Sequence, residues 1–202
     1  MVRDSEATRA RLLAAARKEF AEHGIAGARV DRIAAESGSN KAQIYHYFGS
    51  KDNLFNAVVS GIVAQIVEDT PIDVADLPGY AERLARGCDE QPDVMRLVTW
   101  SRLERGDKLQ VQAVLESNKE KIARIEQAQA DGLIPVRYPA GVLLALILQI
   151  SALWSGMSVE LAAVVGDLGP AARASFVRDA VSVLVASKPV RSALAGKAEL
   201  SE

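Results

Sequence analysis

The sequence predicts an all-α protein of about nine helices, with a three-helix domain at residues 1–50 and a larger helical domain at residues 51–202. Apolar side chains recur at intervals of three and four residues through most of the chain. Glycine and proline interrupt these stretches where helices would end, and no stretch alternates as a β-strand would. The chain of 202 residues, 49% of them hydrophobic, is long enough to bury a proper core.

The first predicted helix runs from Thr8 to His23. Leu13, Ala16 and Phe20 lie at positions i, i+3 and i+7, which places them on one face of a helix. Gly24 follows directly and is a suitable residue to end it. We expect this helix to support the two that come next.

The block from Arg29 to Phe48 predicts two short helices separated by a tight turn. Their apolar positions are Val30, Ile33 and Ala34 in the first helix and Ile44 and Phe48 in the second. Gly38 can take the left-handed backbone conformation that ends a helix, and Asn40 can cap the next helix. The block is therefore interpreted as a helix-turn-helix, in which the second helix enters the major groove of DNA.

The outward face of the second helix carries polar and aromatic side chains suited to phosphates and base edges. Lys41 and Lys51 each lie in the first turn of a helix, where a cation opposes the helix dipole, so contact with phosphate explains them better. Gln43 is the candidate for reading a base, because its amide can bond both N6 and N7 of adenine. Tyr45 and Tyr47 suit either a DNA contact or the core. The predicted DNA-binding set is Arg29, Ser39, Asn40, Lys41, Ala42, Gln43, Tyr45, His46, Tyr47 and Lys51.

A fourth helix is predicted from Lys51 toward Val67, with Ser50 as its N-cap. Because no flexible linker interrupts it, this helix should connect the two domains directly. Five further helices are predicted at residues 78–89, 92–105, 108–131, 139–166 and 170–187. The third of these carries a one-sided stripe made of Val111, Val114, Leu115, Asn118, Ile122 and Ile125.

Charge and cysteine content narrow the functional class. Residues 1–60 hold nine basic and seven acidic side chains, a net of +2, whereas the remaining 15 basic and 19 acidic side chains give −4. This asymmetry fits a DNA contact confined to one end. The single cysteine, Cys88, and the absence of an apolar leader in the first ten residues favour a reducing, cytoplasmic setting. The apolar run from Ala140 to Met157 is interpreted as a buried interface helix, since Gln149 and two serines argue against a membrane span.

The stretch from Thr8 to Val58 resembles the DNA-binding domain of the TetR (tetracycline-repressor) family of bacterial regulators. The matching motifs are Phe20-Ala-Glu-His-Gly24, Asp31-Arg-Ile-Ala34, Gly38, Lys41, Ile44-Tyr-His-Tyr-Phe48 and Lys51-Asp-Asn-Leu54. In the family both tyrosine positions face DNA, and the carboxy-terminal part senses ligands. The chain departs from the pattern at Arg29, where a Ser or Thr usually caps the second helix and touches phosphate. Arg29 can keep that contact by its charge, but the operator sequence cannot be carried over.

The resemblance implies a transcriptional regulator, most simply a repressor released from a palindromic operator by a mostly apolar small molecule. The predicted effector-binding residues are Met95, Trp100, Leu103, Gln149, Ile150, Trp154 and Met157, for each of which a place in the core is the alternative. Two apolar segments, Ala140–Val165 and Ala171–Ala186, are predicted to form a homodimer interface.

No catalytic motif, metal site or cofactor site is expected, because the sequence lacks a CxxC, HExxH, GxSxG or phosphate loop. Two alternatives remain open. One is a helical small-molecule-binding protein or enzyme that uses the carboxy-terminal cavity without DNA. The other is a helix-turn-helix used only for contact with protein, which would not need phosphate-binding lysines.

Overall fold

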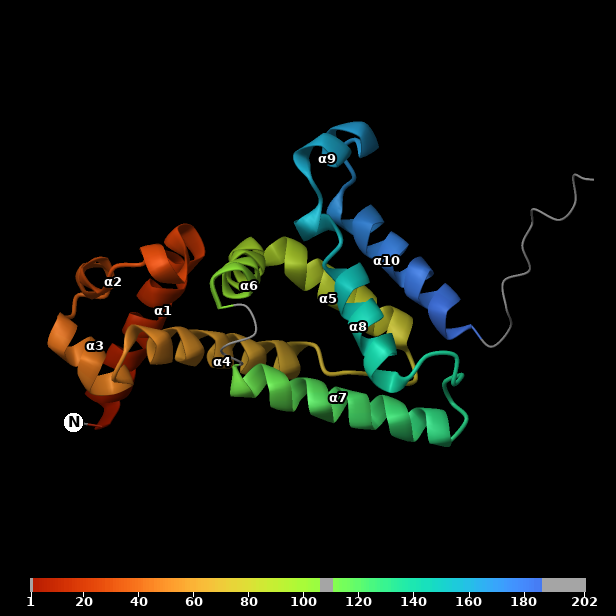
Figure 1. Ribbon diagram of the computed structural model, residues 1–202, viewed down its shortest axis with the longest axis horizontal. Helices are drawn as coiled ribbons and strands as arrows, with labels where there is room; N and C mark the ends of the chain where they lie inside the picture. Colours follow the sequence, from red (N-terminus) through yellow and green to blue (C-terminus); the bar gives the residue numbers. More distant parts are fainter. Residues whose placement is uncertain (1, 106–110, 187–202) are drawn as a thin grey trace, which may run out of the picture.

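The computed structural model describes residues 2–105 and 111–186, and every regular element in that part of the chain is a helix (Figure 1). The helices are α1 (Val2–Gly27), α2 (Val30–Glu36), α3 (Lys41–Phe48), α4 (Lys51–Asp69), α5 (Leu77–Glu90), α6 (Pro92–Arg105), α7 (Gln112–Ala130), α8 (Ala140–Ser151), a 3₁₀ turn (Trp154–Gly156), α9 (Val159–Val165) and α10 (Pro170–Val185). The predicted all-α fold class is confirmed.

Helices α1 to α3 form a small unit, here called the head, around one apolar core. Leu12, Phe20, Ile33 and Ile44 are fully buried in it. Helix α1 begins earlier than predicted, but its regular backbone breaks at Gly24, where φ is 71° and ψ is −177°. The end predicted for the first helix therefore coincides with this kink, and one further turn leads into α2.

Helix α4 connects the head to the remaining helices, here called the body (Figure 1). The Ser50 side chain caps it by accepting a hydrogen bond from the backbone N–H of Asn53 at 3.0 Å. Leu54 and Phe55 of its first turns are buried in the core of the head. Its later turns run alongside α7. The uninterrupted helix predicted from Lys51 is thus present and joins both parts.

The body packs α5 against α8 and α10, with α7 alongside (Figure 1). Tyr80, Leu143, Ile147 and Val181 are buried at its centre. Four predicted helices, at 78–89, 92–105, 108–131 and 170–187, correspond to α5, α6, α7 and α10. The start predicted at 108 and the end predicted at 187 lie outside the described residues.

The prediction of one long helix at 139–166 is wrong. Helix α8 ends at Ser151, whose hydroxyl donates to the carbonyls of Ile147 and Ala81 at 2.8 and 3.2 Å. After the 3₁₀ turn, Met157 takes an extended conformation with φ −70° and ψ 136°. Ser158 then caps α9 by accepting from the N–H of Leu161 at 3.3 Å. The apolar segment Ala140–Val165 is therefore three short helical pieces.

The same break divides the apolar run from Ala140 to Met157, which was considered as a membrane span in the sequence. Over residues 2–105 and 111–186, no helix is both long and apolar enough to cross a bilayer. Within the run itself, α8 contributes only 12 residues.

Candidate nucleic-acid interface and apolar cavity

The turn between α2 and α3 is fixed by hydrogen bonds at both helix ends. Gly38, with φ 62°, lets its N–H bond to the carbonyl of Ala35 at 3.2 Å, while the N–H of Ser39 bonds to that of Ala34 at 2.9 Å. This is the Schellman arrangement that closes a helix. Asn40 and Gln43 then cap α3 reciprocally, each side-chain oxygen accepting from the other's backbone N–H, at 2.9 and 3.2 Å. Hydrogen bonds at the end of α2 and the start of α3 therefore fix the orientation of α3.

Helix α3 buries Ile44 and Phe48 and turns its other side to solvent. The exposed side chains are Lys41, Ala42, Gln43, Tyr45 and His46. Tyr45 is 48% exposed, which is a large surface for an aromatic ring. Tyr47 is half-buried, and its hydroxyl lies 3.1 Å from the Ser5 hydroxyl of α1. The face predicted to meet DNA is therefore exposed to solvent, and Tyr47 lies at its margin.

Lys41 does not point freely into solvent. Its ammonium nitrogen lies 2.7 Å from the carboxylate of Asp31 on α2, and both side chains are more than half exposed. This hydrogen bond raises the pKa of Lys41. An exposed pair of this kind contributes little to stability, so a phosphate can replace the carboxylate at small cost.

Lys51 has a structural role that its position in the sequence does not reveal. Its ammonium group donates to the backbone carbonyls of Ala26 and Ala28, each at 3.2 Å, at the end of α1. No carboxylate of the described chain pairs with it. The charge therefore remains available to a phosphate, while the side chain also fastens α4 to α1.

The start of α2 lacks a capping side chain, because Arg29 occupies the N-cap position. Glu19 of α1 provides the hydrogen-bond acceptor for this end of α2 instead. Its carboxylate accepts from the backbone N–H of Arg29 at 2.7 Å and from the guanidinium of Arg32 at 2.5 to 3.0 Å. Burial alone would raise the pKa of Glu19, but these hydrogen bonds outweigh it and the pKa is lowered. The side chain of Arg29 stays exposed and free to meet DNA.

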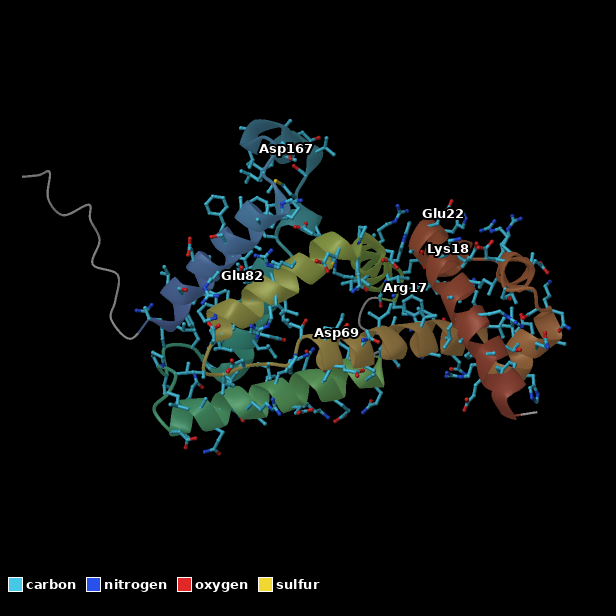
Figure 2. The ribbon with its side chains drawn as sticks, turned by 180° about the vertical axis from the view of Figure 1, so that it is seen from behind. Arg17, Lys18, Glu22, Asp69, Glu82 and Asp167 are labelled. Carbon is cyan, nitrogen blue, oxygen red and sulfur yellow. The ribbon has the colours of Figure 1, made fainter. Side chains whose placement is uncertain are left out.

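Helix α6 of the body contacts α1 of the head through several hydrogen bonds and an ion pair. The guanidinium of Arg96 and the indole N–H of Trp100 donate to the carbonyl of Ala21 at 2.8 and 3.3 Å. Glu104 accepts from the N–H of Ala26 at 2.7 Å. Arg17, labelled on α1 in Figure 2, forms an ion pair with Asp93 at the start of α6. The head is thus held by α6 as well as by α4.

Arg105, at the end of α6, forms a second set of contacts, with residues of α4. Its side chain is 4% exposed, and its guanidinium donates to the side chains of Asn56 at 2.6 Å and Asp52 at 3.0 Å. It also lies 4.4 Å from the centre of the Phe55 ring. These contacts join the end of α6 to the start of α4.

The body contains a cavity of about 570 Å³ between α4, α6 and α7, within the size range of small-molecule sites. Its lining consists of Val59, Ile62, Val63, Ile66, Val67, Val94, Leu97, Val98, Ser101, Arg102, Val111, Val114, Leu115, Ser117, Asn118, Lys121 and Leu148. Four residues of the stripe predicted around α7 belong to this lining, and Ile125 continues the stripe into the core. That stripe was the sequence signal for the cavity.

None of the seven residues predicted to bind an effector lines this cavity. Met95, Trp100 and Trp154 border a separate, more polar depression beside Cys88 and Arg173. Leu103 and Gln149 are exposed, Ile150 packs against the core of the body, and Met157 lies between the 3₁₀ turn and α9. Three of the seven therefore meet at this depression and the other four do not, and Trp100 donates its hydrogen bond to α1 and not toward the cavity. Their role in ligand binding stays a prediction.

The fold and the exposed helix of its helix-turn-helix define the class as a helical DNA-binding regulator. The family model described as "Bacterial regulatory proteins, tetR family" matches residues 12–58, and "Tetracyclin repressor-like, C-terminal domain" matches residues 76–182. The chain therefore belongs to the TetR family, and its relatives are transcriptional regulators rather than enzymes.

Individual relatives agree with this assignment. The HTH-type transcriptional repressor SCO4008 of Streptomyces coelicolor is 40% identical over 147 residues, which cover 72% of this chain and 77% of that protein. The HTH-type transcriptional repressor AcnR of Corynebacterium glutamicum is 37% identical over 86 residues, or 43% of each chain. The solved structure of a putative transcriptional regulator, SCO4942 from Streptomyces coelicolor, is 40% identical, with a TM-score of 0.76 over 88% of this chain and 97% of that one.

Proposed function

We propose that the chain is a ligand-responsive repressor that acts in the cytoplasm as a homodimer. Two copies of α3 bind successive major grooves of a palindromic operator, and a mostly apolar small molecule entering the cavity releases the DNA. One observation carries the proposal. Helices α4 and α6 line the cavity, and the same two helices hold the head through Lys51, Arg96, Trp100 and Glu104.

The coupling needs only a difference in affinity between two arrangements of these helices. A ligand that favours one separation of α4 and α6 shifts the head, because the head has no other large support in the described chain. A coupling of about 1–3 kcal/mol is typical of allosteric proteins and changes operator affinity roughly 5- to 150-fold. This assigns DNA binding to residues 1–50 and ligand binding and dimerisation to residues 51–202, with α4 as the connection.

The dimer is supported by where apolar surface lies. Of the fifteen large hydrophobic side chains exposed in the described chain, eight fall between α8 and α10. They are Val142, Leu153, Val159, Leu161, Val164, Val165, Phe176 and Val183. This concentration of exposed apolar side chains supports a subunit interface in this region. A palindromic site requires two recognition helices about 34 Å apart, and a two-fold dimer supplies two copies of α3 related by the same symmetry as the site.

The direct test is fluorescence anisotropy with DNA from upstream of the chain's own gene. We expect saturable binding to one palindromic segment, weakening steeply as salt is added. An enzyme or carrier that uses the cavity without DNA, or a helix-turn-helix that contacts only protein, would show no preference among fragments at low ionic strength. That outcome would remove the proposal.

Base reading by Gln43 can be separated from its capping role. We expect Gln43→Ala to lose roughly 5- to 150-fold of the discrimination at the base pair it reads, the usual range for one bidentate contact. Because Gln43 also caps α3, Gln43→Glu is the matched control: it keeps the acceptor for the Asn40 N–H and loses the amide donor. Competition between the operator and single-base variants measures the preference. Unchanged discrimination in both variants would exclude Gln43 from base reading.

The two lysines should differ in a way that the geometry predicts. Replacing either Lys41 or Lys51 with methionine should reduce the slope of log affinity against log salt by roughly one unit for each phosphate that is no longer neutralised. Only Lys51→Met should also lower the melting temperature, because it removes two hydrogen bonds to the end of α1. Lys41→Met removes only an exposed ion pair. An unchanged salt slope in both variants would contradict phosphate binding.

A further inference from the structure

The lining of the cavity is apolar apart from a few polar residues that share its two walls. On α6 these are Ser101 and Arg102, and on α7 they are Ser117, Asn118 and Lys121. Two of the five are cations, and no Asp or Glu contributes to the lining in the described chain. Within the described residues, the lining therefore combines apolar walls with two cationic side chains and no carboxylate.

Lys121 is the more informative of the two cations. It is half-buried, and its ammonium group donates to the hydroxyl of Ser117 at 2.7 Å. Burial lowers the pKa of Lys121, partly opposed by the charge of Glu120. Glu120, however, lies next to Arg124, with 3.6 Å between the nearest nitrogen and oxygen. Lys121 thus has a hydroxyl for a partner where a carboxylate would be expected.

Other lysines of the chain show the contrast. Lys18, Lys41 and Lys119 are exposed, and each lies within 3.2 Å of a carboxylate. An exposed lysine gains little from such a partner, whereas a buried cation needs one to offset the loss of water. Lys51 is also half-buried and lacks a carboxylate, but two backbone carbonyls accept from it, whereas the hydrogen-bond partner of Lys121 in the described chain is one neutral hydroxyl.

We propose that the effector is an apolar organic anion whose acidic group pairs with Lys121 while its body fills the cavity between α4, α6 and α7. The inference rests on the proposed function, since it names the chemical class of the effector. Lys121 is the residue that selects for charge. Arg102 adds a second positive charge to the lining, and Asn118 and Ser117 supply neutral hydrogen-bonding groups around the acid.

A matched pair of fluorescent probes tests the charge preference directly. 1-Anilinonaphthalene-8-sulfonate is an apolar anion, and N-phenyl-1-naphthylamine is the same skeleton without the sulfonate. Both emit strongly in apolar cavities, so the dissociation constant of each can be measured on the full chain. We expect the sulfonate to bind at least tenfold more tightly than the neutral probe. Equal affinities, or tighter binding of the neutral probe, would overturn the inference with the wild-type protein alone.

Variants then assign the preference to one side chain. Lys121→Met should weaken the sulfonate roughly 10- to 100-fold, as expected for a hydrogen bond to a charged group, and leave the neutral probe within about threefold. Lys121→Arg should retain the preference. Lys119→Met is the matched control, because it removes one lysine from the same helix but outside the lining. If Lys119→Met matches the effect of Lys121→Met, or if Lys121→Met weakens both probes alike, the inference fails.

Operator binding keeps this outcome distinct from the proposed function. Lys119→Met lies outside both the cavity lining and the head, so its operator affinity without a probe should equal that of the wild type. A neutral probe that releases DNA as effectively as the anion would overturn the inference and leave the repressor mechanism intact. Failure of the unliganded wild type to bind any operator would instead remove the proposed function.

Discussion

Replacing Gly24 with alanine is expected to lower the free energy of unfolding by about 2–6 kcal/mol, because two separate costs add. The backbone of Gly24 has φ 71° and ψ −177°, a region open essentially to glycine alone. A Cβ there would also lie 2.9 Å from two ring atoms of Trp100 and in closer conflict with the carboxylate of Glu104. The carboxylate can move aside, but the indole is held by its hydrogen bond to Ala21.

Two other glycines provide the controls for this prediction. Gly38 has φ 62°, but a Cβ at this position would meet no neighbour within 4 Å, so Gly38→Ala should cost only the conformational part, about 1–2 kcal/mol. Gly61 lies within α4 with open space around it, and Gly61→Ala should be neutral or stabilise by up to about 1 kcal/mol. Thermal or urea denaturation of the three variants measures the order. If Gly24→Ala unfolds like Gly38→Ala, the close packing of α6 on α1 is contradicted.

The Gly24 contact also bears on regulation. Trp100 and Glu104 hold the end of α1, while Leu97, Val98 and Ser101 of the same helix line the cavity. One side of α6 therefore lines the cavity and another contacts the head. Loosening the second side should weaken the link between the two sites even where the variant remains folded.

The head could be predicted from the sequence because local signals determine it. Gly38, Asn40 and Ser50 act within a few residues of themselves, and each has the predicted role in ending or capping a helix. The contacts that the sequence pattern does not reveal join segments distant along the chain. Glu19 reaches Arg29 and Arg32, and Lys51 reaches the end of α1. Contacts between residues so far apart along the chain leave no periodic pattern in the sequence.

In the body, the sequence pattern does not determine where a helix ends or which neighbouring helices its faces meet. Continuous apolar character from residue 140 onward predicts one helix, yet the Ser158 cap lies inside the run and begins a separate one. The stripe on α7 correctly indicates a one-sided helix, but which helices face it depends on the tertiary fold. The bulk of Trp100 suggests a ligand site, while its neighbour Ser101 is the one on the cavity side. Adjacent residues on a helix point about 100° apart, so composition alone cannot assign the face.

Placing charge on α10 should separate the proposed dimer and abolish tight operator binding. Phe176 and Val183 are 53% and 50% exposed and lie seven residues apart, on one face of α10. In a two-fold interface every substitution occurs twice, so Phe176→Asp with Val183→Asp would bring four carboxylates into apolar surroundings. The fold should survive, because α10 packs on α5 through other residues, Ala174, Val177 and Val181, which are buried.

A monomer contacts DNA through one head, whereas the dimer uses two. Losing the second contact typically lowers the affinity for DNA by about 10²–10⁴-fold. Sedimentation velocity would measure the change in mass, and anisotropy on the operator would measure the affinity. Leu133→Asp with Val136→Asp is the matched control, since these side chains are 67% and 76% exposed in the connection between α7 and α8 and do not belong to the eight side chains proposed to form the interface. The control should remain dimeric and bind DNA normally. A charged α10 variant that stays dimeric with unchanged operator affinity would show that the eight exposed apolar side chains serve another purpose, and the two heads would then need a different means of reaching successive grooves.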